Sequence, residues 1–502
     1  MTFFCRMMGT ATLRARLSLG VLVVALTSPS FGQTVAPFSY AQYSASAPYA
    51  AAYDSQTLDE DFFTEAEVEP SELVETGDPV KDLELRLDRL QKKTEKLELD
   101  LDAEKKKNEK KEKPSFPFNT KIGGQLRVDG VYISQNDEAT RNFGDVENSL
   151  GVRDLRLTFG GTGYKTLQYA VAFTVNNNPT FQDVWLRAKD TRYFGDLTVG
   201  NFYVESGMES AETNWDRVYA MVDEGAAMFR LNRRLGVSSQ LFNADKSARA
   251  FFAIFTASNL ATAPHRVNNL DNPGVVLNTR LTAAPILVDD ADGYTREVLH
   301  FGGSYFWLSP AKGANLNLST TGLGWTGANP RFLSCAIPLN DDAYSLANVE
   351  IAYQREGFAT TAEGYFCSVD EGGDAYGATL SARWMLTPGV TRTYVRQDAR
   401  FGSVTMPEST LFFDAKNREI GRNLGALEAV AKWEWVEAND FKEIKDATYG
   451  QVNRSVLGAN WFWSEQINWT FNWEHAFVNA HKNDAPVKGE FDTLVVQGSL
   501  KF

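Results

Sequence analysis

The sequence predicts an all-β protein. We expect one transmembrane antiparallel β-barrel of 16 strands, with 18 as the alternative, over residues 118–502, preceded by a short coiled-coil helix. Three observations support this fold class. Apolar and polar residues alternate in run after run, the runs are about 9–12 residues long, and their apolar faces are rich in Trp, Phe and Tyr. Soluble strands usually end near 5–6 residues, whereas a tilted membrane strand needs about 9–11.

The composition excludes several classes of function. The chain has 502 residues, a formal net charge of -14, and 33 Phe, 18 Tyr and 11 Trp. A nucleic-acid-binding protein needs a basic face, so the acidic balance argues against nucleic acid as a partner. Four His and three Cys leave little material for a zinc site or a Cys/His catalytic pair. We therefore expect no metal site, no cofactor and no catalytic residues.

The amino terminus has the pattern of a secretory signal peptide over residues 1–32. Three arginines precede the apolar run LSLGVLVVAL at 17–26, which is too short to span a bilayer. Ser30 and Gly32 place small residues at the two positions that a signal peptidase reads, so cleavage before Gln33 is expected. An uncleaved anchor is the alternative. No later window offers about 18 apolar residues, so export indicates a secreted protein or an outer-membrane barrel in a Gram-negative-type envelope.

Two further segments precede the predicted barrel. Residues 33–80 form a low-complexity and then acidic stretch that we expect to be a flexible tether. Residues 81–113 carry a heptad pattern typical of a periplasmic coiled-coil helix. The positions of this seam are Leu83, Leu87, Leu90, Thr94, Leu97 and Leu101. Three heptads are marginal alone, so we expect the helix to assist a homotrimer; a solvated single helix is the alternative.

The alternation is clearest near the carboxyl terminus. Ile467, Trp469 and Phe471 share one face with Trp473 and Phe477, while polar residues occupy the other face. The last run ends on Phe502, which resembles the signature that the outer-membrane assembly machinery reads. Eighteen candidate strands begin near Thr120, Val152, Lys165, Phe181, Asp196, Leu235, Arg249, Val276, Glu297, Ala314, Leu346, Phe358, Ala375, Val390, Leu424, Val452, Gln466 and Phe491. We expect one or two of the weaker ones to belong to loops, and 16 strands enclose an aqueous channel.

Residues 151–237 resemble the phosphate-selective porin O and P family. The segments that carry the resemblance are Arg153–Gly160, Tyr164–Tyr169, Asp183–Arg187, Leu197–Phe202 and Arg233–Val237. The resemblance implies an outer-membrane porin built as a trimer of 16-stranded barrels. It also implies that the third external loop, here about 201–233, folds inward and narrows a channel that passes anions such as phosphate.

The candidate pore-lining residues lie in and around this loop. They are Arg156, Arg187, Glu205, Glu209, Glu212, Asp216, Arg217, Arg230, Arg233 and Arg234. Residues 201–229 carry six acidic groups against one basic group, and an anion filter needs rings of Arg or Lys. We therefore expect at best a weak preference for anions. The alternative is that the arginines only neutralise nearby carboxylates and that the acidic groups are solvated.

Cys335 and Cys367 are the two cysteines that remain after removal of the signal peptide. The predicted strands place both at the external rim, in an oxidising compartment. A disulfide between them is therefore expected, with two unpaired thiols as the alternative.

Three functions are consistent with this sequence. The leading interpretation is an outer-membrane porin for passive diffusion of small hydrophilic solutes or ions, with outer-membrane lipid and the permeating solutes as its partners. A structural envelope protein, whose barrel anchors the coiled coil, is the first alternative. A barrel enzyme is the second; it would need a nucleophile beside a histidine, and the histidines lack any such motif. They are His265, His300, His475 and His481.

Overall fold

The computed structural model describes residues 118–502 except 176–179, 213–215, 258–273, 291–292, 310–314, 324–329, 339–341 and 371. Before residue 118 it describes only Leu87, Gln91–Thr94, Lys96 and Leu97, which are helical and exposed. The predicted signal peptide and tether therefore lie outside the described residues, as does most of the predicted coiled-coil seam. The helical residues before the barrel do not by themselves support a coiled coil.

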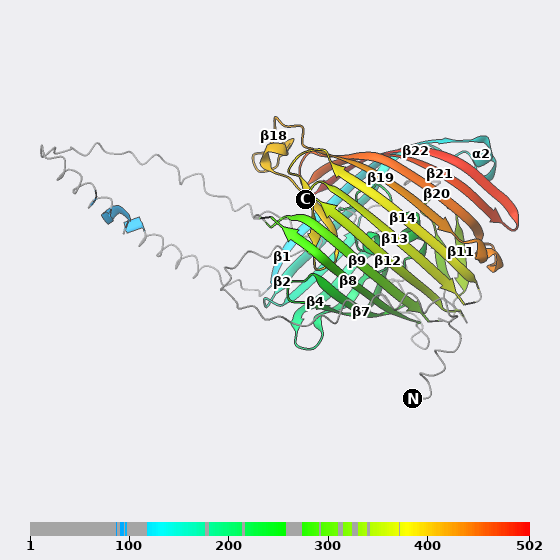
Figure 1. Ribbon diagram of the computed structural model, residues 1–502, viewed down its shortest axis with the longest axis horizontal. Helices are drawn as coiled ribbons and strands as arrows, with labels where there is room; N and C mark the ends of the chain where they lie inside the picture. The colour runs from blue at the N-terminus through cyan, green and yellow to red at the C-terminus, as the bar shows by residue number, and fades with distance from the viewer. Residues whose placement is uncertain are drawn as a thin grey trace, which may run out of the picture. The chain divides into compact units, whose positions relative to one another are not determined.

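The described strands form a closed antiparallel barrel (Figure 1). Its wall consists of β1 (Phe118–Gln135), β2 (Ser149–Gly163), β3 (Leu167–Thr174), β4 (Thr180–Thr191), β5 (Gly195–Tyr203), β6 (Arg233–Phe242), β7 (Ala248–Thr256), β8 (Val275–Asp289), β9 (Thr295–Leu308), β12 (Tyr344–Arg355), β13 (Phe358–Val369), β14 (Gly373–Met385), β19 (Ala426–Glu437), β20 (Thr448–Phe462), β21 (Ile467–Lys482) and β22 (Ala485–Lys501). Each strand pairs with the next in this order. The wall therefore has 16 strands, as predicted.

The first and last strands close the barrel. β22 pairs with β1 from Gln125 opposite Lys501 to Gln135 opposite Phe491. The backbone of Phe502 extends this ladder, because its N–H donates to the carbonyl of Gly124 and its own carbonyl accepts from Gly124 N–H at 2.8 Å. Closure leaves no unpaired sheet edge in the wall, which is the condition for a sheet to span a membrane.

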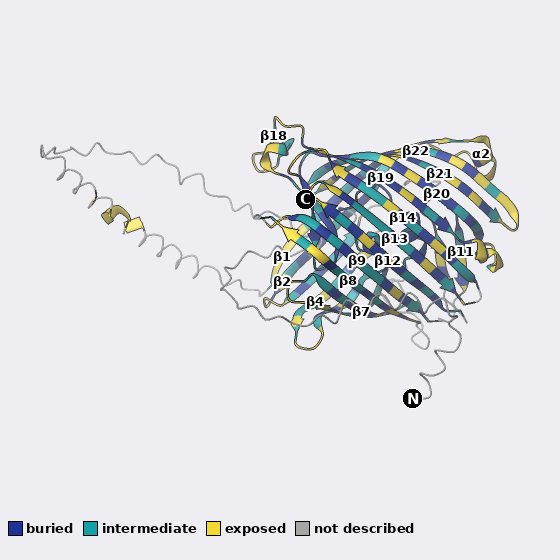
Figure 2. Ribbon diagram, viewed as in Figure 1, coloured by how far each residue is buried: buried dark blue, intermediate teal, exposed yellow. Residues whose placement is uncertain are grey.

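The two faces of the wall differ as the alternation predicts (Figure 2). On β21, Trp473 and Phe477 are exposed on the outside of the barrel. Asn472 and Glu474 face inward and are buried. The outer face is therefore apolar and aromatic, as a lipid-facing surface must be. No helix among the described residues is long and apolar enough to cross a membrane.

Two of the eighteen candidate strands do not belong to the wall. The run near Ala314 corresponds to β10 (Asn315–Ser319), which pairs with β11 (Ser334–Pro338). The run near Val390 corresponds to β15 (Thr391–Val395), which pairs with β16 (Arg400–Thr405). All four are only five or six residues long, too short to span a membrane, and they form hairpins within connections.

The connections differ between the two ends of the barrel. At the rim that carries Phe118 and Phe502, here called the carboxyl-terminal rim, most turns are short, such as 164–166 and 356–357. The opposite rim carries longer connections, one of which contains α2 (Asp137–Phe143). In Figure 1, β18 and the C-terminus mark the first rim, and α2 and β11 mark the second. This matches the short periplasmic turns and long external loops of outer-membrane barrels.

One connection at the carboxyl-terminal rim breaks this pattern. Residues 386–425 join β14 to β19 and contain the hairpin β15–β16, the 3₁₀ turn η3 (Glu408–Thr410), and the two-residue strands β17 (Phe413–Asp414) and β18 (Glu419–Ile420). Tyr394, Arg400 and Phe401 of the hairpin are buried against inward-facing wall residues such as Ala352. The hairpin therefore enters the barrel from the rim where the other turns are short.

The largest apolar cluster lies inside the barrel toward the opposite rim. Inward-facing wall residues such as Phe306 and Val452 pack there against Phe229 of the β5–β6 connection and Leu318 of β10. The short η4 turn (Asn439–Glu443) adds Phe441 to the same cluster. Inward-folded connections thus fill this part of the lumen.

The structure does not contain the predicted disulfide, because Cys335 and Cys367 are both free thiols in it. Both belong to the apolar cluster just described. Each backbone is held in its own ladder: Cys335 lies opposite Leu318 in the inner hairpin, and Cys367 lies in the wall. Placing both cysteines at one rim from the sequence did not establish the geometry that a disulfide needs.

Candidate functional site

The β5–β6 connection, residues 204–232, folds into the barrel and is here called the inward loop. It contains two short helices, α3 (Met208–Ala211) and α4 (Glu224–Phe229). Asp223 caps α4, because its side chain accepts a hydrogen bond from the backbone N–H of Ala226. The loop covers the predicted constriction segment, and buried carboxylates along it determine where it lies.

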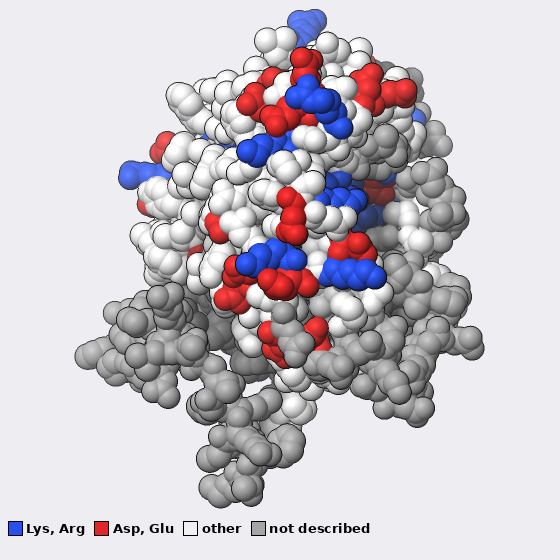
Figure 3. Space-filling view, turned by 90° about the vertical axis from the view of Figure 1, so that its right-hand side faces the viewer, with Lys and Arg blue, Asp and Glu red and all other residues white. Residues whose placement is uncertain are grey.

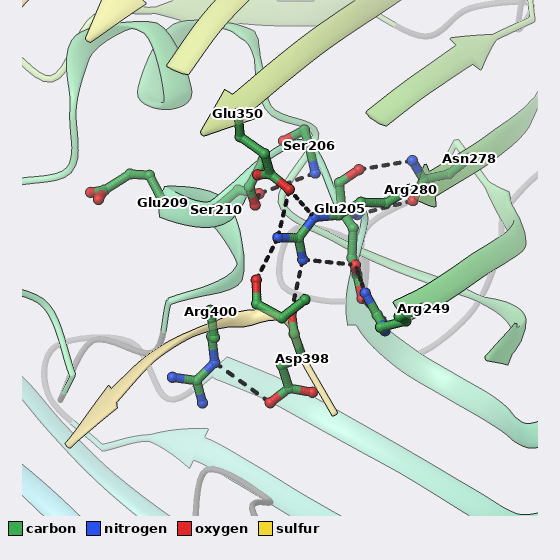
Figure 4. A network of polar contacts seen from close by, with 12 residues as sticks. Glu205, Ser206, Glu209, Ser210, Arg249, Asn278, Arg280, Glu350, Asp398 and Arg400 are labelled. Carbon is green, nitrogen blue, oxygen red and sulfur yellow. Dashed lines mark hydrogen bonds and ion pairs between the residues drawn. The ribbon is translucent and has the colours of Figure 1, made fainter. Parts of the chain in front are cut away.

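Glu205 holds the start of the inward loop against β7 and β8 (Figure 4). Both carboxylate oxygens accept hydrogen bonds from Arg249, at 2.6 Å each. Arg280 lies 3.3 Å from the same carboxylate and also contacts Glu350. Burial alone would raise the pKa of Glu205, but the two guanidinium groups outweigh burial and lower it. The Glu205 carboxylate is thus ionised and fully paired.

Asp216 holds the middle of the inward loop against the hairpin β15–β16. Arg400 donates to one carboxylate oxygen at 2.7 Å, and the Ser403 hydroxyl donates to the other at 2.7 Å. Arg392 donates to the backbone carbonyl of Asp216 at 2.8 Å. Both the side chain and the backbone of this residue are therefore bound to the hairpin.

Glu224 holds the end of the inward loop against β20. Its carboxylate lies 3.0 Å from Arg454, which is also paired with Glu434 at 2.8 Å. Arg454 donates to the carbonyl of Val222 as well. Three of the six acidic groups counted in the sequence are consequently neutralised by arginines that lie outside the loop.

A cavity of about 340 Å³ lies between the inward loop and the β1–β2 side of the wall. Tyr203, Met221 and Val222 contribute to its lining. Its most frequent lining residue is arginine. The arginines are Arg127, Arg153, Arg156, Arg217, Arg230, Arg233 and Arg331. Figure 3, which views the molecule from the opposite rim, shows basic side chains recessed within the hollowed face.

Carboxylates compensate only part of this positive charge. Asp154 lies 3.1 Å from Arg127 and 3.3 Å from Arg156. Asp129 lies 3.0 Å from Arg153. The third carboxylate belongs to Asp183, which binds Arg233 through two hydrogen bonds of 2.9 Å. Among the residues that the structure describes, seven guanidinium groups and three paired carboxylates leave four positive charges around the cavity.

Arg217 and Arg230 of the inward loop form no ion pair with any carboxylate that the structure describes. Arg217 is 9 % exposed, and its Nε has no hydrogen-bond partner among the described residues. The same holds for Nε and one terminal nitrogen of Arg230. Since buried guanidinium groups are costly without partners, these N–H groups are available to an anion in the cavity.

Arg153 reaches the lumen through a β-bulge. Strict alternation would place it on the face opposite Asp154. The register between β1 and β2 shifts at this point, because Arg127 lies opposite Asp154 whereas Val128 lies opposite Val152. The extra residue lets Arg153 contact Asp129 and the carbonyl of Ala220, at 2.6 Å, on the inward loop.

The structure brings four of the ten candidate pore residues together at the cavity: Arg156, Arg217, Arg230 and Arg233. Arg187 instead donates to Thr198 on the neighbouring strand, and Arg234 donates to the carbonyl of Arg233. Glu205 and Asp216 are held in ion pairs, and Glu209 and Glu212 lie elsewhere on the inward loop.

Sequence reasoning missed Arg127, Arg153, Arg331 and Tyr203. The alternation Gln125, Arg127, Asp129 along β1 was a usable signal for the first of these residues. Arg331 belongs to the connection 309–343, and nothing in its local sequence indicates that it reaches the cavity.

Glu212 and Asp223 are buried carboxyl groups of the inward loop whose pKa values are raised. Burial, with the nearby charge of Glu209, raises the pKa of Glu212 to about 8. Burial, with the charges of Glu209 and Glu434, raises the pKa of Asp223 to about 7. At neutral pH these two groups therefore add less negative charge to the loop than the sequence count implies.

The profile of the family described as phosphate-selective porin O and P matches residues 121–502. No curated protein sequence matches the chain. The barrel is similar to OmpT of Vibrio cholerae in its trimer form, with TM-score 0.45, 11% identity, and coverage of 77% of this chain and 99% of that chain. It is also similar to an anion-selective porin from Comamonas acidovorans, with TM-score 0.43, 10% identity, and coverage of 77% and 100%.

Proposed function

Because the chain belongs to the phosphate-selective porin O and P family and is an outer-membrane porin for passive diffusion of small hydrophilic solutes, we propose that its channel prefers small anions. The observation that carries this proposal is the cavity beside the inward loop, where seven arginines meet three paired carboxylates. Family membership supports a channel rather than an enzyme.

The charge distribution favours anions for a simple electrostatic reason. Rings of Arg or Lys lower the energy of an anion in a narrow passage and raise that of a cation. The carboxylates expected to oppose this effect, such as Glu205 and Asp216, are each bound to an arginine outside the loop. Counting the loop's own charges gave a weak anion preference because it left out those partners.

The two kinds of arginine in the cavity have different roles in this proposal. Arg217 and Arg230, which lack a described carboxylate partner, offer N–H donors that replace water around a passing anion. Arg127, Arg156 and Arg233 form ion pairs with aspartates. These pairs reduce the electrostatic attraction of the cavity for a passing anion. Conduction needs such a balance, because an anion that binds too tightly does not leave.

Substitution of Arg217 and Arg230, the inward-loop arginines without a described carboxylate partner, tests the proposal. Arg217→Gln with Arg230→Gln removes two of the four uncompensated charges and should move the reversal potential in a KCl gradient toward that of an unselective channel. The control is Arg296→Gln, since Arg296 is 40% exposed and pairs with Asp290 at the rim. The proposal fails if the double variant and the control behave alike.

The assembly and export of the chain are proposed on sequence grounds. We expect a mature chain that begins at Gln33, a homotrimer assisted by the heptad seam, and an outer surface solvated by outer-membrane lipid. The mass of the mature protein tests the cleavage site. Leu90→Lys with Leu97→Lys in the full chain should lower the temperature at which the trimer dissociates on semi-native gels; an unchanged temperature would exclude a role for the seam.

A further inference from the structure

The hairpin β15–β16 enters the barrel from the carboxyl-terminal rim and meets the inward loop, which enters from the opposite rim. The two segments join at Asp216, whose side chain binds Arg400 and Ser403. Arg392 holds the carbonyl of the same residue. The next residue in the chain, Arg217, lines the cavity. One peptide unit thus connects the hairpin to the cavity's unpaired positive charge.

We propose that this hairpin determines the anion selectivity of the channel at a distance: it holds Asp216, and this contact orients Arg217 toward the cavity. The inference rests on the proposed anion preference and assigns positioning roles to Asp216, Arg400 and Ser403. None of these three residues lines the cavity. Each acts through the conformation of the inward loop.

The geometry fixes both the position and the rotation of the Asp216 peptide. Two side-chain acceptors and one carbonyl acceptor bind three different residues of the hairpin. Such an arrangement restrains rotation of the backbone at Asp216 and therefore the direction in which the following side chain points. That side chain, Arg217, lies among the arginines of β1 and β2.

The hairpin itself is firmly held, which a positioning device requires. Arg392 binds Glu428 of β19 through two hydrogen bonds, at 2.9 Å and 2.8 Å. Tyr394 contacts the ring of His300 through a hydrogen bond of 2.7 Å. Arg280 donates to the carbonyls of Asp398 and Ala399 at the hairpin's turn, at 2.8 Å each (Figure 4). The wall thus fixes the hairpin, and the hairpin fixes the loop.

Charge counting and positioning predict opposite results for Asp216→Ala. If only charge matters, removal of a carboxylate makes the channel more anion-selective. If Asp216 positions Arg217, its removal releases the loop and the channel becomes less anion-selective. The same reasoning applies to Arg400→Gln, which breaks the contact and leaves the carboxylate in place. These opposite signs separate a positioning role from a general electrostatic one.

The experiment measures reversal potentials in a KCl gradient for the full chain carrying Asp216→Ala, Arg217→Gln, or both. We expect Asp216→Ala to reduce anion selectivity in the wild-type background, and to increase it slightly in the Arg217→Gln background, where only its charge counts. Arg400→Gln should act like Asp216→Ala. The control is Arg396→Gln, since Arg396 belongs to the same hairpin but pairs with Asp289.

Folding of each variant is checked by its heat-dependent mobility on gels. If Asp216→Ala does not fold, Arg400→Gln replaces it in the test. If Arg217→Gln lowers selectivity but Asp216→Ala raises it, the positioning role is wrong and the anion proposal stands. If Arg217→Gln leaves the reversal potential unchanged, Arg217 does not contribute to the anion preference. The positioning role of Asp216 is then also wrong.

Discussion

Arg249 binds Glu205 end-on, with its two terminal nitrogens each 2.6 Å from one carboxylate oxygen. The two residues lie 44 positions apart in the chain, one at the start of the inward loop and the other in the wall. The side chain of Arg249 is almost completely buried, and that of Glu205 is 12% exposed. This pair fixes the point at which the loop leaves the wall.

Glu205→Gln should therefore destabilise the protein. Removing one partner of a buried ion pair leaves an uncompensated charge and costs about 3–5 kcal/mol. Here both Arg249 and Arg280 lose their ion pair with Glu205. We expect a lower unfolding temperature and larger current fluctuations, measured by heat-dependent gel mobility and single-channel recording.

Glu209→Gln is the matched control for this substitution. Glu209 belongs to the same loop, and its side chain forms no ion pair with any described residue. It should unfold at the wild-type temperature. Equal effects of the two substitutions would mean that Glu205 has no special role in anchoring the loop.

Gly124 is required for the last residue to dock. A Cβ atom at this position would lie 2.5 Å from the ring of Phe502 and 2.6 Å from the backbone carbonyl oxygen of Arg156. The backbone cannot yield at low cost, so Gly124→Ala should cost about 1–3 kcal/mol, as overpacking generally does. We expect a smaller yield of closed barrel after refolding in detergent.

Gly130→Ala in the same strand is the comparison. Its Cβ would find its nearest atom 3.7 Å away, which is ordinary contact. This variant should refold like the wild type. If Gly124→Ala refolds equally well, closure does not depend on the tight approach of Phe502 to β1.

The anion preference should weaken as pH rises. Glu212, with a pKa of about 8, and Asp223, with a pKa of about 7, are largely neutral below these values and become anionic above them. Each proton lost adds a negative charge to the inward loop, so reversal potentials should move away from the anion side between about pH 6 and 9.

Glu212→Gln with Asp223→Asn should remove this pH dependence. Asparagine is as good an N-cap as aspartate, so α4 should keep its start. The same two groups also make the free energy of unfolding decrease as pH rises from about 4 to 8, because the folded chain binds more protons than the unfolded chain there. A pH-dependence that persists in the double variant would assign it to other groups.

The sequence predicted the strands of the barrel wall better than the segments that fold into the lumen, for a physical reason. Membrane strands have a strict two-residue period, so runs such as the one through Trp469 and Phe471 identify both strand and face. The strands of the inner hairpins are short. Their alternation alone does not distinguish a wall strand from a strand within a connection. A bulge reverses the expected direction of Arg153, and no local pattern reveals it.

The charge of the site depended on contacts that sequence does not contain. The partners of Asp216 and Glu224 are Arg400 and Arg454, each far along the chain. Their pairing follows from how two inward-folded segments meet inside a closed barrel. Counting charge within residues 201–229 could not include this pairing, because the two arginines lie outside that range.

The sign of the reversal potential of the wild-type channel tests the anion proposal most directly. Purified full-length protein is inserted into a planar bilayer that separates concentrated from dilute KCl. The four uncompensated charges around the cavity predict that chloride carries more of the current than potassium. The reversal potential should therefore have the sign of an anion-selective channel. A potential of the opposite sign, with potassium as the main carrier, would contradict the account.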